Sequence, residues 1–283
     1  MNYRHAFHAG NFADVVKHII LVRILSYMMR KETAFRVIDT HAGVGLYDLW
    51  GDAAERTGEW REGIGRLIAH GLPDAAAALV VPYLLAVKAQ NPDGGLRYYP
   101  GSPFIARHML RPQDRLMALE LHPQDADFLK ENFAGDIQTR VTHLDGWAAM
   151  GTHLPPKEKR GLVLVDPPFE QKGEFGRMAN SLIKAHKRWP GGTYAYWYPI
   201  KDPADVTAYA TALKATGIPR ILRLELTIRA PSTPPRLHGS GMVVINPPYV
   251  LEEEMKIILP ALAALLADEG RGRFRIEWIR GEA

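Results

Sequence analysis

Short apolar runs alternate with amphipathic segments along most of this chain. The apolar runs predict strands at residues 35–39, 116–121, 139–144, 161–165, 193–198, 221–228 and 241–245. Segments with helical patterning lie between most of them, at residues 123–133, 175–188 and 204–215. Strands that alternate with helices form a sheet covered on both faces. The pattern therefore predicts an α/β fold with a mostly parallel, seven-stranded sheet.

The two ends of the chain add further elements. Residues 11–30 read as a helix that Asn11 caps, with Asp14 in its first turn. A helix at 251–267 and a strand at 274–279 are predicted near the C-terminus. The loop between strands 221–228 and 241–245 is too short for a helical crossover, so these two strands are expected to pair antiparallel.

One connection in the sheet is unusually long. About 70 residues separate the first two strands, whereas a strand–helix unit needs only about 20. Helices are predicted within this stretch at 74–89 and 102–110. We therefore expect a sheet domain of residues 1–45 and 113–283, which includes the N-terminal arm and helix (1–30), and an inserted helical subdomain of residues 46–112.

Composition narrows the class of protein. Hydrophobic residues make up 47% of the chain and charged residues 23%, as in soluble globular proteins. There is no cysteine, which excludes disulfides and thiolate zinc sites. No apolar run is long enough for a membrane span, no signal peptide is visible, and no spacing typical of metal ligands occurs. These features predict a cytoplasmic protein without a metal, with a monomer as the default.

The charge is mildly basic, at +4, with an isoelectric point of about 9.2. Its distribution is uneven: within residues 220–240, four arginines (Arg220, Arg223, Arg229 and Arg236) face only one acid, Glu225. Residues 1–36 hold a second excess of lysine and arginine. Both clusters are compatible with a nucleic-acid partner, and both equally fit an ordinary solvated surface.

A glycine loop, Asp39-Thr-His41-Ala-Gly43-Val-Gly45, follows the first predicted strand. Such a loop could bind either a dinucleotide or S-adenosylmethionine. A dinucleotide-binding loop would need a third glycine where Asp48 stands. The first motif of an S-adenosylmethionine methyltransferase also has spaced glycines after an acid.

Acids at the ends of the next three strands favour the methyltransferase interpretation. Glu120 is placed to accept the ribose hydroxyls of a nucleoside, and Asp145, followed by Gly146, to accept an adenine amino group. Asp166 ends the fourth strand. Because parallel strands present their carboxyl ends at one edge, these acids are expected to meet near the glycine loop.

Asp166-Pro167-Pro168-Phe169 is typical of enzymes that methylate an exocyclic amino nitrogen, above all N6 of adenine. That nitrogen is a poor nucleophile because its lone pair is delocalised. A carboxylate from Asp166 and the Pro167 carbonyl would accept its two hydrogens, since proline carbonyls stay rigidly aimed. Phe169 would stack on a base taken out of its helix.

A second copy, Asn246-Pro-Pro-Tyr249, fits the same loose pattern. Its strand is the predicted hairpin partner, so its end should lie at the opposite edge of the sheet. We therefore interpret this copy as a structural turn before the last helix.

Taken together, the motifs resemble the RlmJ family of 23S ribosomal RNA adenine-N6 methyltransferases. The resemblance runs from Tyr3-Arg-His5-x-Phe-His8-Ala-Gly10-Asn11-x-Ala-Asp14-Val-x-Lys17-His18, through the glycine loop, Glu55-Arg-Thr-Gly58-Glu59 and Leu96-Arg-Tyr-Tyr-Pro-Gly-Ser102-Pro103, to Trp197-Tyr-Pro199 and Ser240-Gly-Met-x-x-Ile-Asn-Pro-Pro248. It covers nearly the whole chain. It implies a Rossmann-like class I S-adenosylmethionine-dependent fold and 23S rRNA as the partner.

The resemblance also implies roles for individual residues. S-adenosylmethionine would be bound by Lys17, His18, His41, Gly43, Ser102, Glu120, Asp145, Gly146 and Asp166. Asp166 would be catalytic. Tyr3 and His5 of the N-terminal arm, with Pro167 and Phe169, would hold the RNA. Phe169 departs from the tyrosine frequent in the family, which preserves stacking but removes a hydroxyl.

Several alternatives stay open. Asp-Pro-Pro-aromatic motifs also occur in DNA adenine methyltransferases, although no separate DNA-recognition domain is visible. A nucleic-acid-binding protein with an inactive cofactor site is another possibility, and a glutamine-directed protein methyltransferase a third, since that chemistry uses Asn-Pro-Pro-Tyr. Trp197 and Tyr198 fit either a base pocket or the core.

Overall fold

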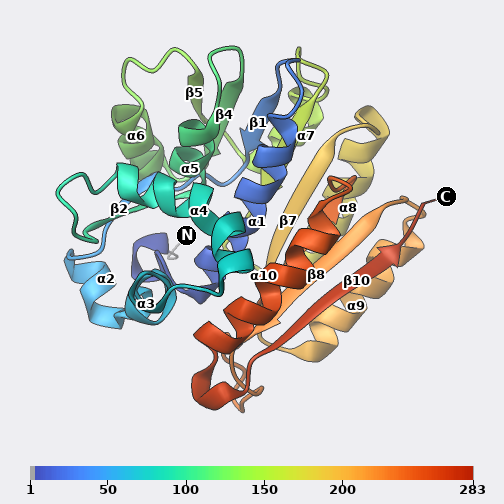
Figure 1. Cartoon of the computed structure of the whole chain (residues 1–283). Helices are drawn as coiled ribbons and strands as arrows, with labels where there is room; N and C mark the ends of the chain where they lie inside the picture. The colour runs from blue at the N-terminus through green and yellow to red at the C-terminus, as the bar shows by residue number, and fades with distance from the viewer. Residues whose placement is uncertain (1–3, 283) are drawn as a thin grey trace.

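A single twisted sheet organises the computed structural model, which describes residues 4–282 (Figure 1). Within these residues the sheet has eight strands in the order β10-β8-β9-β7-β6-β1-β4-β5. The strands are β1 (Arg36–Asp39), β4 (Arg115–Glu120), β5 (Thr139–His143), β6 (Gly161–Val165), β7 (Thr193–Ile200), β8 (Ile221–Thr227), β9 (Gly239–Ile245) and β10 (Arg273–Arg280).

Pairing within the sheet confirms the predicted α/β class. Strands β5, β4, β1, β6 and β7 pair with one another in this order, and all four pairs are parallel. Strand β9 is antiparallel to both β7 and β8, which confirms the predicted hairpin. The sheet has eight strands instead of the predicted seven. The additional strand is the C-terminal β10, which pairs antiparallel with β8 at the edge of the same sheet.

Helices cover both faces of the sheet. One face packs against α1 (Phe12–Met28), α5 (Ser102–Met109), α6 (Pro123–Asn132) and α10 (Leu251–Leu266), and the other against α7 (Gly146–Thr152), α8 (Glu174–Arg188) and α9 (Pro203–Ala215). A hydrophobic core lies on each face of the sheet, and successive strand residues contribute to the two cores in turn. Val37, for example, belongs to the core under α1 and Ile38 to the core under α8. Each strand of the centre is therefore buried on both sides, as its continuous apolar sequence predicts.

Helix α1 lies across the sheet with nearly all of its residues buried. Its start confirms the predicted cap, because Asn11 Oδ1 accepts hydrogen bonds from the backbone N–H groups of Ala13 and Asp14 at 2.9 and 3.0 Å. Its charged residues Asp14, Lys17 and Arg23 are buried as well. This helix consequently brings polar groups into the interior near its N-terminus.

Most of the long connection between β1 and β4 packs beside α1, and its last helix, α5, also covers the sheet. It contains β2 (Leu46–Asp48), α2 (Asp52–Thr57), a π-helical turn (Arg61–Gly65), α3 (Arg66–His70), α4 (Asp74–Ala89), β3 (Tyr98–Pro100) and α5. Two 3-10 turns, η1 (His5–Phe7) and η3 (Asp268–Gly270), complete the described elements. The helices predicted at 74–89 and 102–110 are confirmed, and the division of the chain at residues 46–112 stays a prediction.

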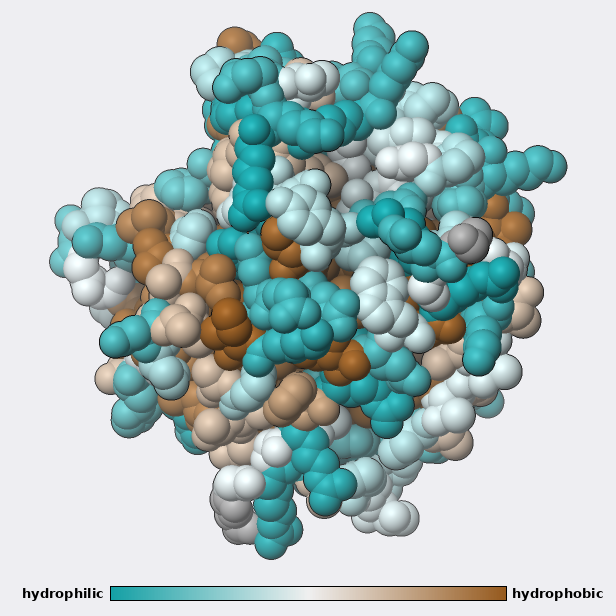
Figure 2. Space-filling view, turned by 45° about the vertical axis from the view of Figure 1, so that its right-hand side comes forward, coloured by the Kyte–Doolittle hydropathy of each residue, from teal (hydrophilic) through white to brown (hydrophobic). Residues whose placement is uncertain are grey.

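The surface is mixed in character. Figure 2 shows hydrophobic side chains gathered left of centre on one face, with hydrophilic ones above and to the right. Exposed large hydrophobic residues include Val81 and Leu85 of α4 and Ile257 of α10. Among residues 4–282, no helix has both the length and the apolar character needed to cross a membrane. The expected monomer stays a prediction.

Candidate active site

A cavity of about 170 Å³ opens at the carboxyl ends of β1, β4 and β6. Most of the residues predicted for the site line it: His5, Lys17, His18, His41, Gly43, Ser102, Glu120, Asp145, Gly146, Asp166 and Pro167. Because β1 and β6 are neighbours, the glycine loop and the Asp-Pro-Pro motif lie side by side at the switch point of the sheet. Tyr3 lies outside the described residues.

The glycine loop is tied to β4 through Glu120. The backbone N–H of Gly43 donates to Glu120 Oε2 at 2.8 Å, and the N–H of His122 donates to Oε1 at 2.8 Å. Gly43 has φ of +60°, a conformation that favours glycine. Burial raises the pKa of Glu120. The carboxylate is thus fixed by backbone groups and keeps lone pairs for a ligand hydroxyl.

Asp145 and Gly146 begin helix α7 at the same edge. Asp145 caps the helix, since its Oδ1 accepts the N–H of Trp147 at 2.9 Å. Gly146 packs on the loop after β1: a Cβ atom on this residue would lie 2.1 Å from the Thr40 carbonyl oxygen. A glycine is therefore required here for α7 to approach β1.

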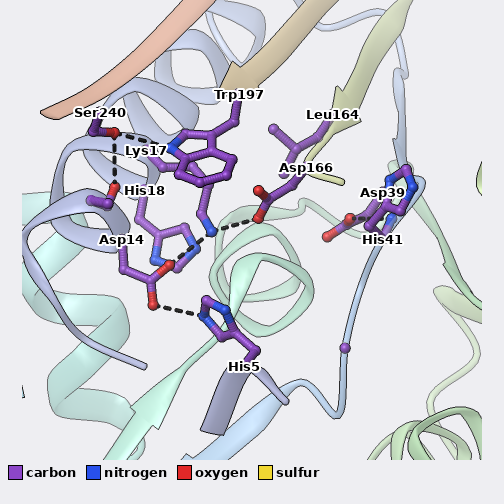
Figure 3. A network of polar contacts seen from close by, with 12 residues as sticks. His5, Asp14, Lys17, His18, Asp39, His41, Leu164, Asp166, Trp197 and Ser240 are labelled. Atoms are coloured by element: carbon purple, nitrogen blue, oxygen red, sulfur yellow. Dashed lines mark hydrogen bonds and ion pairs between the residues drawn. The ribbon is translucent and has the colours of Figure 1, made fainter. Parts of the chain in front are cut away.

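Lys17 lies between two carboxylates at the centre of the site (Figure 3). Its Nζ is 2.5 Å from Asp166 Oδ2 and 2.7 Å from Asp14 Oδ1. Although burial alone would lower it, these two carboxylates raise the pKa of Lys17 well above the ordinary value. Lys17 is accordingly a permanent cation that joins α1 to the end of β6.

Asp14 also anchors the N-terminal arm. Its Oδ2 accepts the N–H of Gly10 at 2.9 Å and lies 2.9 Å from His5 Nε2. Burial alone would raise the pKa of Asp14, but His5 and Lys17 hold it well below the ordinary value. The sequence indicated only a first-turn acid at this position. Its role as a link between the arm, helix α1 and the Asp166 loop depends on contacts that no local pattern reports.

Three buried polar atoms around the site make no hydrogen bond within residues 4–282: His18 Nε2, Asp39 Oδ2 and Glu174 Oε1. His18 Nδ1 is held by the Tyr99 hydroxyl at 2.7 Å. Burial lowers the pKa of His18 to about 3 and raises that of Asp39 to about 7. Unpaired buried groups are costly, so they indicate a polar ligand that satisfies them. The donors and acceptors present fit the amino-acid and ribose groups of S-adenosylmethionine.

Asp39 and Glu174 were not among the predicted site residues. Asp39 could have been found, because it begins the glycine loop at the end of β1. Glu174 had no comparable signal, since an acid at the start of a helix is ordinary. Only the packing of α8 beside the cavity shows its place.

Phe169 is the predicted residue that the structure does not bring into the cavity of Asp166. Its φ is +53°, and its ring packs edge-on against Phe175 at 5.0 Å and Trp197 at 6.1 Å between centroids. It lines a neighbouring cavity of about 540 Å³. Gln171 and Glu174 border both spaces, so the two cavities adjoin.

The two aromatic residues at the end of β7 face opposite sides of the sheet, and a role of Trp197 in a base pocket stays a prediction. Trp197 faces the site, with its ring centroid 5.6 Å from Lys17 Nζ and its Nε1 donating to Ser240 Oγ at 3.0 Å. Tyr198 points to the other side, is fully buried, and donates to Glu225 at 2.8 Å. Neighbouring strand residues face opposite ways, so only one of the pair can reach the site.

The second proline motif lies away from the site, as predicted. Ile245 pairs with Tyr194 at the start of β7, which places Asn246 at the opposite edge of the sheet. The Asn246 amide donates to the carbonyls of Pro190 and Gly192, both at 2.8 Å. This copy therefore closes a turn before α10.

Comparisons with known proteins agree with this geometry. The family model described as "Ribosomal RNA large subunit methyltransferase D, RlmJ" matches residues 32–280. A Haemophilus influenzae protein named ribosomal RNA large subunit methyltransferase J is 45% identical over 284 residues, which is 100% of both chains. The Escherichia coli protein of the same name is 42% identical over 279 residues and 99% of each chain.

A solved structure has a closely similar fold. The crystal structure of a Legionella pneumophila protein has a TM-score of 0.87 and 35% identity, and the match covers 96% of this chain and 98% of that one. The predicted class I S-adenosylmethionine-dependent methyltransferase fold is confirmed by the α/β architecture and the mixed, mostly parallel sheet. With matches that span nearly its full length, the chain belongs to the RlmJ family of ribosomal RNA large subunit methyltransferases.

Proposed function

We propose that this protein transfers a methyl group from S-adenosylmethionine to N6 of a specific adenine in 23S ribosomal RNA. The observation that carries the proposal is the position of Asp166 and Pro167 at the rim of the cavity beside the glycine loop. The relatives' names support a ribosomal RNA of the large subunit as the substrate. A cytoplasmic location follows from such a substrate.

The cofactor would be held by residues that reach the cavity from several elements. Glu120 would accept the ribose hydroxyls, and Asp145 with Gly146 would hold the adenine. The remaining groups would meet the methionine end: Lys17, His18, His41, Gly43, Ser102 and Asp166. When bound, S-adenosylmethionine supplies an electrophilic methyl group. Its polar groups would satisfy the unpaired atoms of His18 and Asp39.

Asp166 would act on the target base as an ionised acceptor. The ion pair with Lys17 holds its carboxylate in place, with Lys17 Nζ 2.5 Å from Asp166 Oδ2. Accepting one N–H from the amino group, while the Pro167 carbonyl accepts the other, would localise the nitrogen lone pair. The lone pair would form the new N–C bond as the sulfur–methyl bond breaks, which would leave S-adenosylhomocysteine. The nitrogen, then positively charged, would lose one of its protons to solvent. Positioning would supply much of the acceleration.

The target base would have to leave its stack to reach this rim. Phe169 already lies at the neighbouring cavity, between Phe175 and Trp197. A flipped adenine would therefore meet Phe169 and the N-terminal arm, which includes Tyr3 and His5. Proline carbonyl and aromatic ring would together hold the plane of the base.

Methyl transfer from labelled S-adenosylmethionine to protein-free 23S rRNA tests the proposal. Genomic DNA and the Asp166→Ala variant are run in parallel, and the products are digested to nucleosides. We expect N6-methyladenosine from RNA only, and a loss of at least about 100-fold in the variant. Label in DNA alone would indicate a DNA adenine methyltransferase. Cofactor binding without transfer to either nucleic acid would indicate a binding protein.

A further inference from the structure

A row of cationic side chains follows the same edge of the sheet as Asp166. Lys201 comes directly after β7 and Arg229 two residues after β8, while Arg273 begins β10. Strands β7 and β8 point in the same direction as β6, and Arg273 is paired with Thr227 at the end of β8. With Lys172, in the loop after β6, these residues form what we call the basic strip: Lys172, Lys201, Arg229 and Arg273.

Two cavities connect the members of the strip. Lys172 and Lys201 line the space of about 540 Å³ that also contains Phe169. Arg229 and Arg273 line a cleft of about 610 Å³ between β8, β10 and the start of α9. The segment from Ile200 to Pro203, at the end of β7, borders both. The two hollows of the strip therefore lie on either side of the end of β7, and the first of them adjoins the cavity of Asp166.

Most of these cations are available to a ligand. Lys172, Lys201 and Arg273 are exposed, and none of them forms an ion pair with a carboxylate among residues 4–282. Arg229 pairs with Asp268 at 2.8 Å, with both side chains nearly half exposed. Asp202, another nearby acid, is engaged in capping α9 by accepting the N–H of Ala204 at 2.8 Å. Exposed lysine and arginine without partners are the groups that neutralise phosphates.

The cleft lies over β8 and β10, on the face of the sheet opposite α10. Leu222, Leu224 and Leu226 of β8 face the core under α10, so Arg223 and Glu225 face the other way. Those two pair with each other at 2.7 Å, and Arg275 of β10 lies 3.4 Å from Glu225. The charged residues on the floor of the cleft, Arg223, Glu225 and Arg275, are thus paired with one another. Arg273, at the mouth of the cleft, has no carboxylate partner in the part of the chain that the structure describes. The loops that follow β8 and α10 meet there, as the hydrogen bond from Asp268 N to the Ile228 carbonyl shows (Figure 1).

We infer that the basic strip binds the sugar–phosphate backbone of the RNA strand that carries the target adenine. The inference rests on the proposed function and names a second surface for the same substrate. Neighbouring strands are about 4.8 Å apart, so the four steps from β6 to β10 span roughly 19 Å. That length faces several consecutive phosphates of one strand. The cations would fix the register of the RNA while Asp166 and Phe169 receive the base.

The test removes the three unpaired cations together, in Lys172→Ala/Lys201→Ala/Arg273→Ala. Binding of 23S rRNA is measured by filter retention over a series of salt concentrations. Each phosphate contact contributes about 0.7 to the slope of log affinity against log salt for single strands, so the slope should fall by about 2. KM for RNA should rise at least tenfold, while kcat at saturating RNA and the affinity for S-adenosylmethionine stay at wild-type values.

A matched control removes the same charge at the amino ends of the strands, in Lys31→Ala/Arg140→Ala/Lys157→Ala. All three side chains are exposed. This variant should keep the wild-type salt slope. An unchanged slope in the strip variant, or equal losses in both variants, overturns the inference. The two proposals can fail separately. If the salt slope for RNA binding falls in the strip variant but the wild-type protein methylates no RNA, the proposed function is wrong and the RNA-binding role of the basic strip is retained.

Discussion

Lys17 determines the charge balance of the site at the scale of single residues. It is 3% exposed and compensates two carboxylates on different elements, Asp14 and Asp166. Burying a charged group costs a large free energy unless a group of opposite charge pairs with it. The contact also places Asp166 before any substrate arrives, because its carboxylate is held by a side chain that itself cannot move far inside the packed helix.

Replacing Lys17 by methionine should therefore destabilise the fold. Lys17→Met leaves two carboxylates close together without their cation, which typically costs about 3 kcal/mol or more. Urea denaturation at pH 8 measures the free energy of unfolding. The double variant Asp14→Asn/Lys17→Met should recover part of the loss, since it removes one of the uncompensated charges. A loss below about 1 kcal/mol in the single variant would show that water, rather than Lys17, satisfies these carboxylates.

Asp39 gives a second prediction, on pH. Burial raises its pKa from 3.8 to about 7, so the folded protein binds this proton more tightly than the unfolded chain does. The contribution of Asp39 to stability is therefore present near pH 4 and is lost as pH rises to 7. Asp39→Asn should match wild type near pH 4 and exceed it above pH 7, by at most about 4 kcal/mol.

Thermal or urea unfolding of both proteins from pH 4 to pH 8.5 measures that difference directly. His18, whose pKa is lowered to about 3, has the opposite sign and destabilises the fold as pH falls below 6.5, but it is common to both proteins and cancels. S-adenosylmethionine should bind the Asp39→Asn variant more weakly at pH 8. A variant less stable than wild type at pH 8 contradicts the assignment.

At the scale of elements, close contact between α7 and the loop after β1 shapes the side of the cavity that we propose for the cofactor. Gly146→Ala places a methyl group 2.1 Å from the Thr40 carbonyl, which cannot move without disturbing the glycine loop. We expect a loss of about 1–3 kcal/mol in unfolding free energy and weaker binding of S-adenosylmethionine by calorimetry.

Gly151 provides the control within the same helix. A Cβ atom there meets no atom of residues 4–282 within 4 Å, and an alanine should stabilise the helix by up to about 1 kcal/mol. If both substitutions have the same effect, the approach of α7 to β1 does not determine the site.

The elements show why sequence patterns predicted some features and missed others. Continuous apolar runs predicted each central strand, and the short loop before residue 241 predicted the β8–β9 hairpin, because both depend on local composition and length. The burial of Lys17 was not predictable: on a helix, a lysine normally indicates the solvent side. The direction of Phe169 also had no local signal, since a positive φ after two prolines depends on the packing of Phe175 and Trp197.

For the whole molecule, the strand order separates two tasks. On one side of β6, the glycine loop, Glu120 and Asp145 lie at the ends of β1, β4 and β5, and they are proposed for the cofactor. On the other side, Lys201, Arg229 and Arg273 lie at the ends of β7, β8 and β10, and they are proposed for the RNA. Asp166 ends β6, where the two halves meet. The N-terminal arm closes the arrangement from the side of the 46–112 segment, because His8 Nδ1 and Asn11 Nδ2 lie 3.0 and 2.9 Å from Glu59 Oε2.

This link predicts that Glu59 controls the order of the arm. Glu59→Ala removes the shared acceptor and should cost about 1 kcal/mol locally, since Glu59 is partly exposed. Hydrogen exchange should become faster at residues 4–11 and stay unchanged in β1 and β6, because local opening does not need global unfolding. Glu62→Ala, one turn away and paired only with Arg66 among the described residues, is the control. If exchange in the arm is equal in both variants, Asp14 alone holds the arm, and the 46–112 segment does not contribute to its closure over the site.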